Sequence, residues 1–251
     1  MSAIRVSQNE VYRTAQRALE AAGAPFGLDR DGALAVAWLE ARQLPGLELL
    51  AVALGRLDGA FGSFAAPELD GAPAVLDLAG RPAVVASGAV LDCLGLLRDR
   101  RGGPAPLSLR RCRWPLFLLP ALATASVGGT GFLLRWRYGA ATVTCIAEPS
   151  GRCRIVLESS RIDLGQVVRS SGPVEVLVQE RTSSVRRAGR ADHARIVDAE
   201  TLEAALRRTL TAGILVDDAL WARIGATAAR VLVPPSDESR QRGAGGGDPN
   251  D

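Results

Sequence analysis

The sequence predicts an α/β (α+β) fold with an N-terminal helical layer, a central antiparallel-rich sheet and two C-terminal helices. Apolar residues recur at helical spacing over residues 7–58. Short segments of alternating or β-branched residues, separated by tight turns, fill residues 132–181. Two more helical patterns follow Asp198 and Asp217.

The N-terminal layer is predicted to contain three short helices. Ser7 and Glu10 have the spacing of a capping box, and Gly23 ends the apolar pattern that follows them. A second helix is expected from Asp29 to Gln43, where Leu34 and Trp38 share one side. Pro45-Gly46 ends it, and a third helix starts at Leu47 and ends before Gly59.

The segment between this layer and the sheet is less regular. Residues 60–86 predict loops with one or two short strands, and Ser87 is expected to cap a helix that ends at Arg98. Residues 98–106 predict a linker, and Leu116–Leu119 a short buried strand. The uncharged segment from Trp114 to Leu134 is long enough to cross a membrane, but its prolines and glycines argue against a spanning helix.

The sheet is predicted from alternation and turns. Leu134, Trp136 and Tyr138 should share one face of a strand, with Arg135 and Arg137 on the other. A hairpin at Gly139 leads to residues 141–147, a turn at 149–151 to residues 154–158, and Gly172-Pro173 to residues 174–181. Residues 181–195 predict a loop.

The chain is expected to form one globular domain over residues 1–235, followed by a Gly-rich mobile tail over residues 236–251. In the first C-terminal helix, Leu202, Ala205, Leu206 and Leu210 are predicted to face inward. The larger set of side chains expected to be buried consists of Trp38, Leu50, Trp136, Val176, Leu206 and Leu220.

The composition excludes several function classes. All 30 basic residues are arginines, so lysine Schiff-base chemistry, a pyridoxal-phosphate anchor and a Walker-type loop are excluded. His193 is the only histidine, which excludes a multi-histidine metal site. A net charge of +3 is too small for a general nucleic-acid binder. The four cysteines include no C-x-x-C pair, and no apolar leader segment opens the chain, so we expect a cytoplasmic protein without a bound metal or a membrane partner.

Three short motifs have both a chemical and a purely structural interpretation. Residues 126–131 resemble a phosphate-binding loop, but they lack its lysine and precede a strand, which favours a turn. His193 beside Asp192 could act as a general base, although an exposed loop histidine is the simpler interpretation. Residues 29–32 have a calcium-loop spacing without the later ligands, so helix-start carboxylates explain them better.

The arginines are the best candidates for ligand binding. Arg135 and Arg137 share a strand face, Arg154 lies on a nearby strand, and Arg240 precedes Gly243-Ala244-Gly245 in the tail. Grouped guanidinium groups can hold a carboxylate or a phosphate through two parallel hydrogen bonds. These four arginines predict a site for a small anionic metabolite, while a solvated sheet face remains the alternative. The residues identify no catalytic group and no cofactor.

Several motifs are similar to those of a bacterial, mainly proteobacterial, protein family of unknown function. They are Ser7-x-Asn9-Glu10-Val11, Gly27-Leu28, Trp38-Leu39 and the segment 44–50 near the start of the chain, and Val233-Pro234, residues 238–240, residues 243–245 and Asn250-Asp251 at its end. The resemblance covers both ends and implies membership over the whole chain. It implies no established activity.

The N-terminal helix pattern and residues 233–238 also resemble the non-Rossmann malate/lactate dehydrogenase-like family. In that family a Ser-His-Gly motif after the second helix supplies the catalytic histidine. The corresponding place here reads Gln43-Leu44-Pro45-Gly46, with no histidine. This resemblance therefore implies a chain that lacks the family's acid/base group, which favours a binding or accessory role over hydride transfer.

Three functions stay open from the sequence. The first is a protein that binds a small anionic metabolite or acts as an accessory subunit. The second is an enzyme distantly related to the non-Rossmann malate/lactate dehydrogenases. The third is an interaction protein that forms homo-oligomers through its helical layer.

Overall fold

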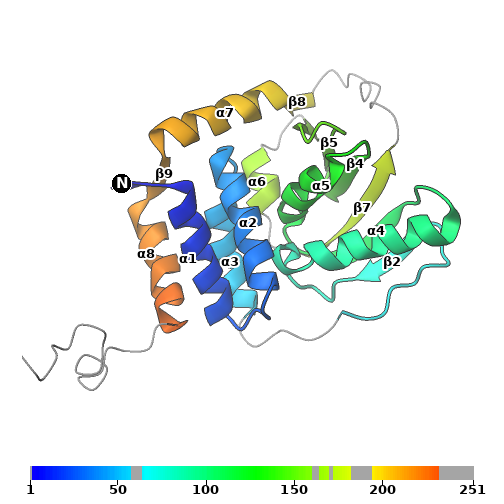
Figure 1. The fold of residues 1–251 in the computed structure, drawn as a ribbon, viewed down its shortest axis with the longest axis horizontal. Coiled ribbons are helices and arrows are strands. Elements are labelled where there is room, and N and C mark those ends of the chain that lie inside the picture. Colours follow the sequence, from blue (N-terminus) through cyan, green and yellow to red (C-terminus); the bar gives the residue numbers. More distant parts are fainter. Residues whose placement is uncertain (1, 58–63, 160–163, 170–171, 182–193, 232–251) are drawn as a thin grey trace, which may run out of the picture.

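The computed structural model describes residues 2–57, 64–159, 164–169, 172–181 and 194–231, and its helices and strands build two layers. The helical layer contains α1 (Gln8–Ala21), α2 (Leu28–Ala41), α3 (Gly46–Leu57) and α8 (Asp218–Ala228). Figure 1 shows α1 between α8 and α2, with α3 behind them. The predicted capping box is confirmed, because the Ser7 side chain accepts from the Glu10 N–H and the Glu10 carboxylate from the Ser7 N–H.

The second layer is a seven-stranded sheet in the order β2-β3-β7-β4-β5-β6-β8. Only β2 and β3 pair in parallel, so the predicted antiparallel-rich sheet is confirmed. Its strands are β2 (Ala74–Asp77), β3 (Leu107–Cys112), β4 (Gly131–Tyr138), β5 (Ala141–Ala147), β6 (Cys153–Glu158), β7 (Val174–Arg181) and β8 (Ala194–Val197).

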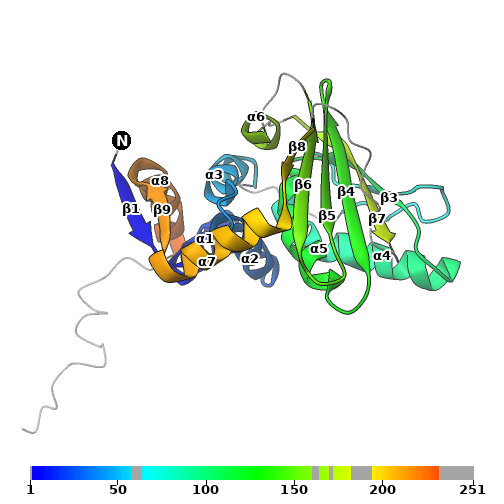
Figure 2. The ribbon, with the colours of Figure 1, turned by 90° about the horizontal axis from the view of Figure 1, so that it is seen from above.

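Helices α4 (Ser87–Arg101) and α5 (Leu119–Ser126) cover one face of this sheet, as Figure 2 shows. Leu134, Trp136 and Val176 are buried on the covered face, while Arg135 and Arg137 are exposed on the other. The predicted strand register is therefore correct. The buried apolar residues of the helical layer and of the sheet join in one hydrophobic cluster.

A two-stranded antiparallel sheet joins the ends of the described chain. It pairs β1 (Ala3–Val6) with β9 (Ile214–Asp217), and neither strand was expected from the sequence. Helix α7 (Ala199–Ala212) runs from β8 of the large sheet to β9 (Figure 2), and the short α6 (Leu164–Arg169) follows β6. The two C-terminal helices α7 and α8 are confirmed, with Asp198 and Asp217 as their caps.

Several predictions for individual elements were wrong. Residues 116–119 are not a strand: they belong to the 3-10 helix η2 (Pro115–Leu118) and the start of α5. Ala83–Val85 forms the 3-10 helix η1, and Leu107–Cys112 and Ala194–Val197 are strands that were not expected. The short η3 (Ala229–Val231) follows α8. Prolines at the first turns of η2 and α5 explain the first error, because proline at that position starts helices.

Burial also differs from the prediction at several positions. Leu50, Trp136 and Val176 are buried as expected, whereas Trp38, Leu206 and Leu220 are only partly buried. Leu34 and Leu210 are exposed, with 58% and 66% of their surface accessible, because α2 lines a pocket and α7 lies at the surface. The predicted domain boundary at residue 235 and the tail, residues 236–251, lie outside the described residues.

Candidate functional site

Two of the predicted ligand-binding arginines line one pocket on the face of the sheet opposite α4 and α5. Arg135 and Arg137 alternate with buried Leu134 and Trp136 along β4, so both guanidinium groups point away from the core. We call the hollow they line the arginine pocket, and its volume is about 530 Å³. Its lining also includes Pro73, Ser108, Thr142, Pro173, Val174, Glu175 and Leu177, from β3, β5, β7 and the segments before β2 and β7.

The two guanidinium groups differ in how they are engaged. Arg135 Nη2 lies 3.8 Å from Glu158 Oε2, and about half of the Arg135 side chain is exposed. Among the described residues, no ion pair and no side-chain hydrogen bond engages Arg137. The Arg137 donors are therefore available to an incoming acceptor, since nothing in the described part of the chain competes for them.

The acidic residue of the arginine pocket is already held by a neighbour. Ser108 is buried and its Oγ donates to Glu175 Oε1 at 2.6 Å, across the β3–β7 pair. That hydrogen bond orients the Glu175 carboxylate, and the pocket retains two arginines against one acid. Glu158 pairs with Arg135 from outside this lining, so the Arg137 guanidinium, which no acid of the described residues pairs, is the group that favours an anion.

The structure separates the other predicted ligand residues from this pocket. Arg154 lies on the same sheet face, because it pairs with Ile146 while Arg135 pairs with Thr144 two residues away. Two strands and two residues of displacement separate the Cα atoms of Arg154 and Arg135 by roughly 12 Å. Arg154 does not line the arginine pocket. Arg240 lies outside the described residues, and so does His193.

The short motifs of the sequence have structural roles where they are described. The Asp29 carboxylate is buried and accepts hydrogen bonds from Gln16 Nε2 and from the Gly27 N–H, which explains the acidic start of α2. Residues 127–130 form the turn between α5 and β4, with positive φ angles at Gly128 and Gly129. Among the residues that the structure describes, no three histidine, cysteine or acidic side chains gather as metal ligands.

A second polar pocket, which the sequence did not reveal, lies at the turn between α2 and α3. We call it the turn pocket, and its volume is about 520 Å³. Its polar lining comes from Glu40 and Gln43 of the turn, Arg208 of α7, and Arg5 and Asp217 of the two-stranded sheet. Residues far apart in the sequence meet here because β1 pairs with β9 beside the turn.

Glu40 is the unusual residue of the turn pocket. Its Oε1 accepts from the Leu47 N–H at 2.6 Å, so it caps the start of α3. Burial raises the pKa of Glu40 to about 7, against the opposing effect of the backbone hydrogen bonds from Leu47 and Gly46. Glu40 therefore changes its charge near neutral pH, which makes it an acid–base candidate within the turn pocket.

The guanidinium groups of the turn pocket are engaged with the protein itself. Arg208 Nη2 donates to Gln43 Oε1 at 3.2 Å, Arg5 Nη1 donates to the Ala212 carbonyl, and Arg169 pairs with Glu48. This distinguishes the turn pocket from the arginine pocket, because an anion would have to replace existing contacts of these arginines.

The match to known families is confined to the N-terminal part of the chain. Residues 6–74 match the model of a family described as "Protein of unknown function (DUF3726)". The predicted resemblance to a family of unknown function is thus confirmed for this region. It contains α1, α2, α3 and the segment Gln43-Leu44-Pro45-Gly46 between α2 and α3. No curated protein matches the chain.

The fold resembles that of solved dehydrogenase structures. A dehydrogenase from Sinorhizobium meliloti superposes with a TM-score of 0.66 at 14% identity, over 91% of this chain and 100% of that chain. Malate dehydrogenase from Pyrococcus horikoshii gives 0.66 at 11% identity, over 93% and 97%. Sulfolactate dehydrogenase from Methanocaldococcus jannaschii gives 0.60 at 8% identity, over 91% and 97%. The similarity to the malate/lactate dehydrogenase-like fold is therefore confirmed.

Proposed function

We propose that this protein binds a small anionic metabolite in the arginine pocket through Arg135 and Arg137. One observation carries the proposal: Arg137 presents a guanidinium group that no described side chain engages, two residues from Arg135 on the same strand face. Two guanidinium groups spaced along a strand suit a ligand with two acidic groups, or one carboxylate bound through two hydrogen bonds. Arg154 and Arg240 stay predictions as additional contacts.

The similar structures support an acidic ligand. Malate and sulfolactate, which name two of those enzymes, each carry two acidic groups. The lining of the arginine pocket offers hydrogen-bond donors to such acidic groups: the hydroxyl of Thr142 and the guanidinium groups of the two arginines. Malate is therefore the first probe for binding to the arginine pocket, and inorganic phosphate is the second.

Calorimetric titration of the Arg135→Ala and Arg137→Ala variants tests this function. Removing one charge-assisted contact should weaken malate or phosphate binding by roughly 1.5–3 kcal/mol. Arg17→Ala is the matched control, because Arg17 is an exposed arginine on α1 away from the pocket. If both pocket variants bind the probes as tightly as the wild type, the arginines form only a solvated face and the proposal is wrong.

A second candidate is an enzyme that transfers a proton at the turn pocket. It is favoured by the Glu40 carboxyl, whose pKa of about 7 lies where a general acid–base group works best. Abstraction of a proton next to a carbonyl group needs such a base together with a donor for the enolate oxygen, for which the arginines of the same pocket are the candidates. We infer no further step from this pocket.

Proton exchange measures this second candidate directly. Incubation of 2-oxo acids with the protein in heavy water, followed by NMR, reports loss of the C–H signal next to the carbonyl. The expected result is faster exchange with the wild type than with Glu40→Gln, whose amide can still accept from the Leu47 N–H. Equal rates for both proteins would exclude Glu40 as a base.

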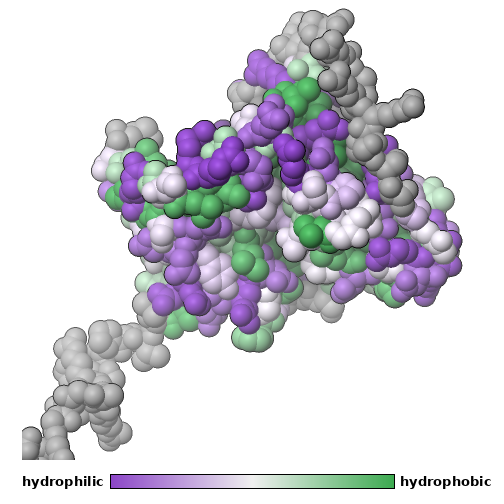
Figure 3. All heavy atoms as spheres, turned by 45° about the horizontal axis from the view of Figure 1, so that its top comes forward, coloured by the Kyte–Doolittle hydropathy of each residue, from purple (hydrophilic) through white to green (hydrophobic). Residues whose placement is uncertain are grey.

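Homo-oligomerisation and a cytoplasmic location stay predictions. Leu210 on α7 and Leu215 on β9 are 66% and 65% exposed, which supports an apolar contact with a second copy. Figure 3 shows hydrophilic and hydrophobic residues intermixed over the face it presents.

All four cysteines are free thiols, which supports a reducing compartment. No helix among the described residues is long and apolar enough to cross a membrane.

A further inference from the structure

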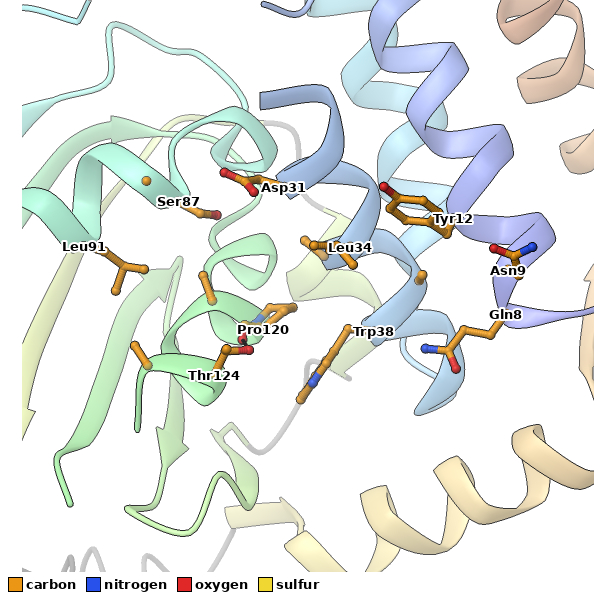
Figure 4. Close-up of a pocket in the computed structure, with 15 residues that line it drawn as sticks. Gln8, Asn9, Tyr12, Asp31, Leu34, Trp38, Ser87, Leu91, Pro120 and Thr124 are labelled. Carbon is orange, nitrogen blue, oxygen red and sulfur yellow. Dashed lines mark hydrogen bonds between the residues drawn. The ribbon is translucent and has the colours of Figure 1, made fainter. Parts of the chain in front are cut away.

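A third hollow lies between the helical layer and the helices that cover the sheet. We call it the helical pocket; its volume is about 840 Å³, and it is separate from the arginine pocket and the turn pocket. Figure 4 shows its walls, which come from α1, α2, α4 and α5. Its lining is mostly apolar and includes no arginine, so its chemistry differs from that of the other two pockets.

The N-terminus of α4 opens into the helical pocket. The prediction that Ser87 caps this helix is wrong: Ala86 is the N-cap residue, and it provides no side-chain hydrogen bond. The Val90 N–H donates to the Ala86 carbonyl, so the N–H groups of Ser87, Gly88 and Ala89 precede the first hydrogen bond of the helix. These groups and the helix dipole favour a negatively charged acceptor at this end.

The Ser87 side chain provides independent evidence for a ligand at the same place. Ser87 is 6% exposed, and its Oγ is buried without a hydrogen-bond partner in the described structure. Ser87 lines the helical pocket, and Figure 4 shows its hydroxyl on the pocket side of α4. A buried hydroxyl without a partner is costly to the protein, so a ligand acceptor beside it would supply the missing hydrogen bond.

An acidic side chain lies at the same end of the pocket. Asp31, in the first turn of α2, lines the helical pocket, and Figure 4 shows its carboxylate at the end where the Ser87 hydroxyl lies. The packing of Gly32 explains this proximity, because a Cβ atom there would lie 3.1 Å from the Val84 carbonyl oxygen, just before α4. Asp31 is exposed and has no partner among the described ion pairs, so it can bind a cation.

The rest of the helical pocket is an apolar channel that leads away from this charged end. Leu34 and Trp38 of α2 lie opposite Leu91 of α4 and Pro120 of α5. Asp31 and Trp38 are seven residues apart on one helix, which corresponds to roughly 10 Å along its axis. Arg42 stacks on the Trp38 ring at 3.8 Å and holds the indole in place at the far end of the channel.

From these features we propose that the helical pocket binds an α-amino acid with an aromatic or long apolar side chain. The carboxylate would accept from the N-terminal amides of α4 and from the Ser87 hydroxyl. The ammonium group would pair with Asp31, and the side chain would lie between Leu34 and Pro120 toward Trp38. The charged groups of an α-amino acid are adjacent, as are the N-terminus of α4 and Asp31.

Calorimetry with three related probes separates the two halves of this recognition. L-Phenylalanine carries both charged groups, 3-phenylpropionate carries only the carboxylate, and 2-phenylethylamine carries only the ammonium group. The wild type should bind L-phenylalanine about tenfold or more tightly than either single-charge probe, because each charged contact contributes at least that factor. Failure of L-phenylalanine to bind at millimolar concentration would overturn the proposal.

Two polar substitutions assign the contacts. Ser87→Ala should weaken L-phenylalanine and 3-phenylpropionate but leave 2-phenylethylamine unchanged. Asp31→Asn should weaken L-phenylalanine and 2-phenylethylamine but leave 3-phenylpropionate unchanged or tighter. Identical effects on all three probes would contradict the proposed orientation.

A steric pair of variants controls for effects on folding. No atom lies within 4 Å of a Cβ built at Gly88 or at Gly95, both on α4, but only Gly88 lines the helical pocket. Gly88→Leu should abolish binding of all three probes while Gly95→Leu retains it. Binding by Gly88→Leu equal to that of the wild type would place the ligand elsewhere. The Arg135→Ala and Arg137→Ala variants should bind L-phenylalanine normally, which keeps this result independent of the anion-binding proposal.

Discussion

At the scale of single residues, the most informative side chains are those whose burial conflicts with their polarity. Ser87 and Glu40 are both such groups: Ser87 lies in the first turn of α4, and Glu40, near the end of α2, caps the start of α3. The two residues resolve the conflict differently. Glu40 accepts a backbone hydrogen bond and shifts its pKa, whereas the Ser87 hydroxyl is left without a partner.

The unpartnered hydroxyl gives a stability prediction for the ligand-free protein. Ser87→Ala removes a buried polar atom that forms no hydrogen bond, so the free energy of unfolding should rise by about 1 kcal/mol or stay unchanged. Urea denaturation measures it. A loss of stability of similar size would mean that the hydroxyl has a protein partner, and it would remove the strongest evidence for the amino-acid site.

Glu40 gives a prediction for the pH dependence of stability. The folded protein holds the Glu40 proton up to about pH 7, whereas the unfolded chain releases it near pH 4.5. Between these values the folded state binds more protons, so stability falls as the pH rises. This shift corresponds to roughly 3 kcal/mol over the whole window. In Glu40→Gln this decrease should disappear, while Glu20→Gln, on the exposed side of α1, should keep it.

Sequence reasoning could identify Arg135 and Arg137 as site candidates, whereas it assigned Ser87 only a helix-capping role and did not single out Glu40. The arginines alternate with apolar residues along a strand, and this period-two pattern is visible in the chain itself. The importance of Ser87 and Glu40 comes from neighbours contributed by other helices. Their environment depends on how α4 and α3 pack against α2, which no local pattern encodes.

At the scale of secondary-structure elements, the turn between α2 and α3 brings these two helices into close contact. Gln43 has a left-handed backbone with φ of 57°, and the Leu49 N–H donates to the Pro45 carbonyl at the start of α3. A Cβ atom at Gly46 would lie 2.6 Å from the Val36 carbonyl oxygen. The glycine of the Leu-Pro-Gly segment is therefore required for the close approach of α3 to α2.

A matched pair of glycine variants tests this contact. Gly46→Ala should destabilise the protein by about 1–3 kcal/mol, because the helices must move apart to admit the methyl group. Gly55→Ala, in the same helix and with no atom within 4 Å, should stabilise it by up to about 1 kcal/mol. Thermal unfolding followed by circular dichroism measures both. Equal melting temperatures for the two variants would contradict the packing at Gly46.

Element boundaries were predictable where caps mark them and not where tertiary contacts decide. Ser7, Asp198 and Asp217 identified three helix starts from local chemistry alone. The strands β1 and β9 have four residues each and exist only because they pair with one another across the chain. In α7, Leu202, Ala205 and Thr209 form the buried stripe, since the helix packs mainly on α2 and β6, and Leu210 is exposed.

At the scale of the whole molecule, the core protects every cysteine. Cys93, Cys112, Cys145 and Cys153 are free and at most 5% exposed. Burial raises the pKa of Cys153 to about 12 and moves the pKa of each of the other three above its usual value. A thiol reagent at neutral pH should therefore react slowly with the folded protein and should label four thiols once it is unfolded. Rapid labelling of the native protein would contradict this core.

The overall architecture was more predictable than the function. Three segments of distinct periodicity were enough to predict a helical layer, an antiparallel-rich sheet and two C-terminal helices. The two pockets beside α2 are lined by side chains from distant parts of the sequence, such as Asp31 and Ser87 in one and Glu40 and Arg208 in the other. The sequence therefore predicted the arginine face of a strand and neither of the pockets beside α2.

The pairing of β1 with β9 has a consequence for how the chain folds as it is synthesised. Ala3 pairs with Asp217 and Val6 with Ile214. The first strand to leave the ribosome can therefore pair only after β9, one of the last elements, has been synthesised. Helices α1 to α3 can pack early, but α8 reaches its place on α1 only after more than two hundred residues have been added. During translation the apolar side of α1 that faces α8 stays uncovered, and a nascent chain stalled before residue 214 should bind chaperones through this surface.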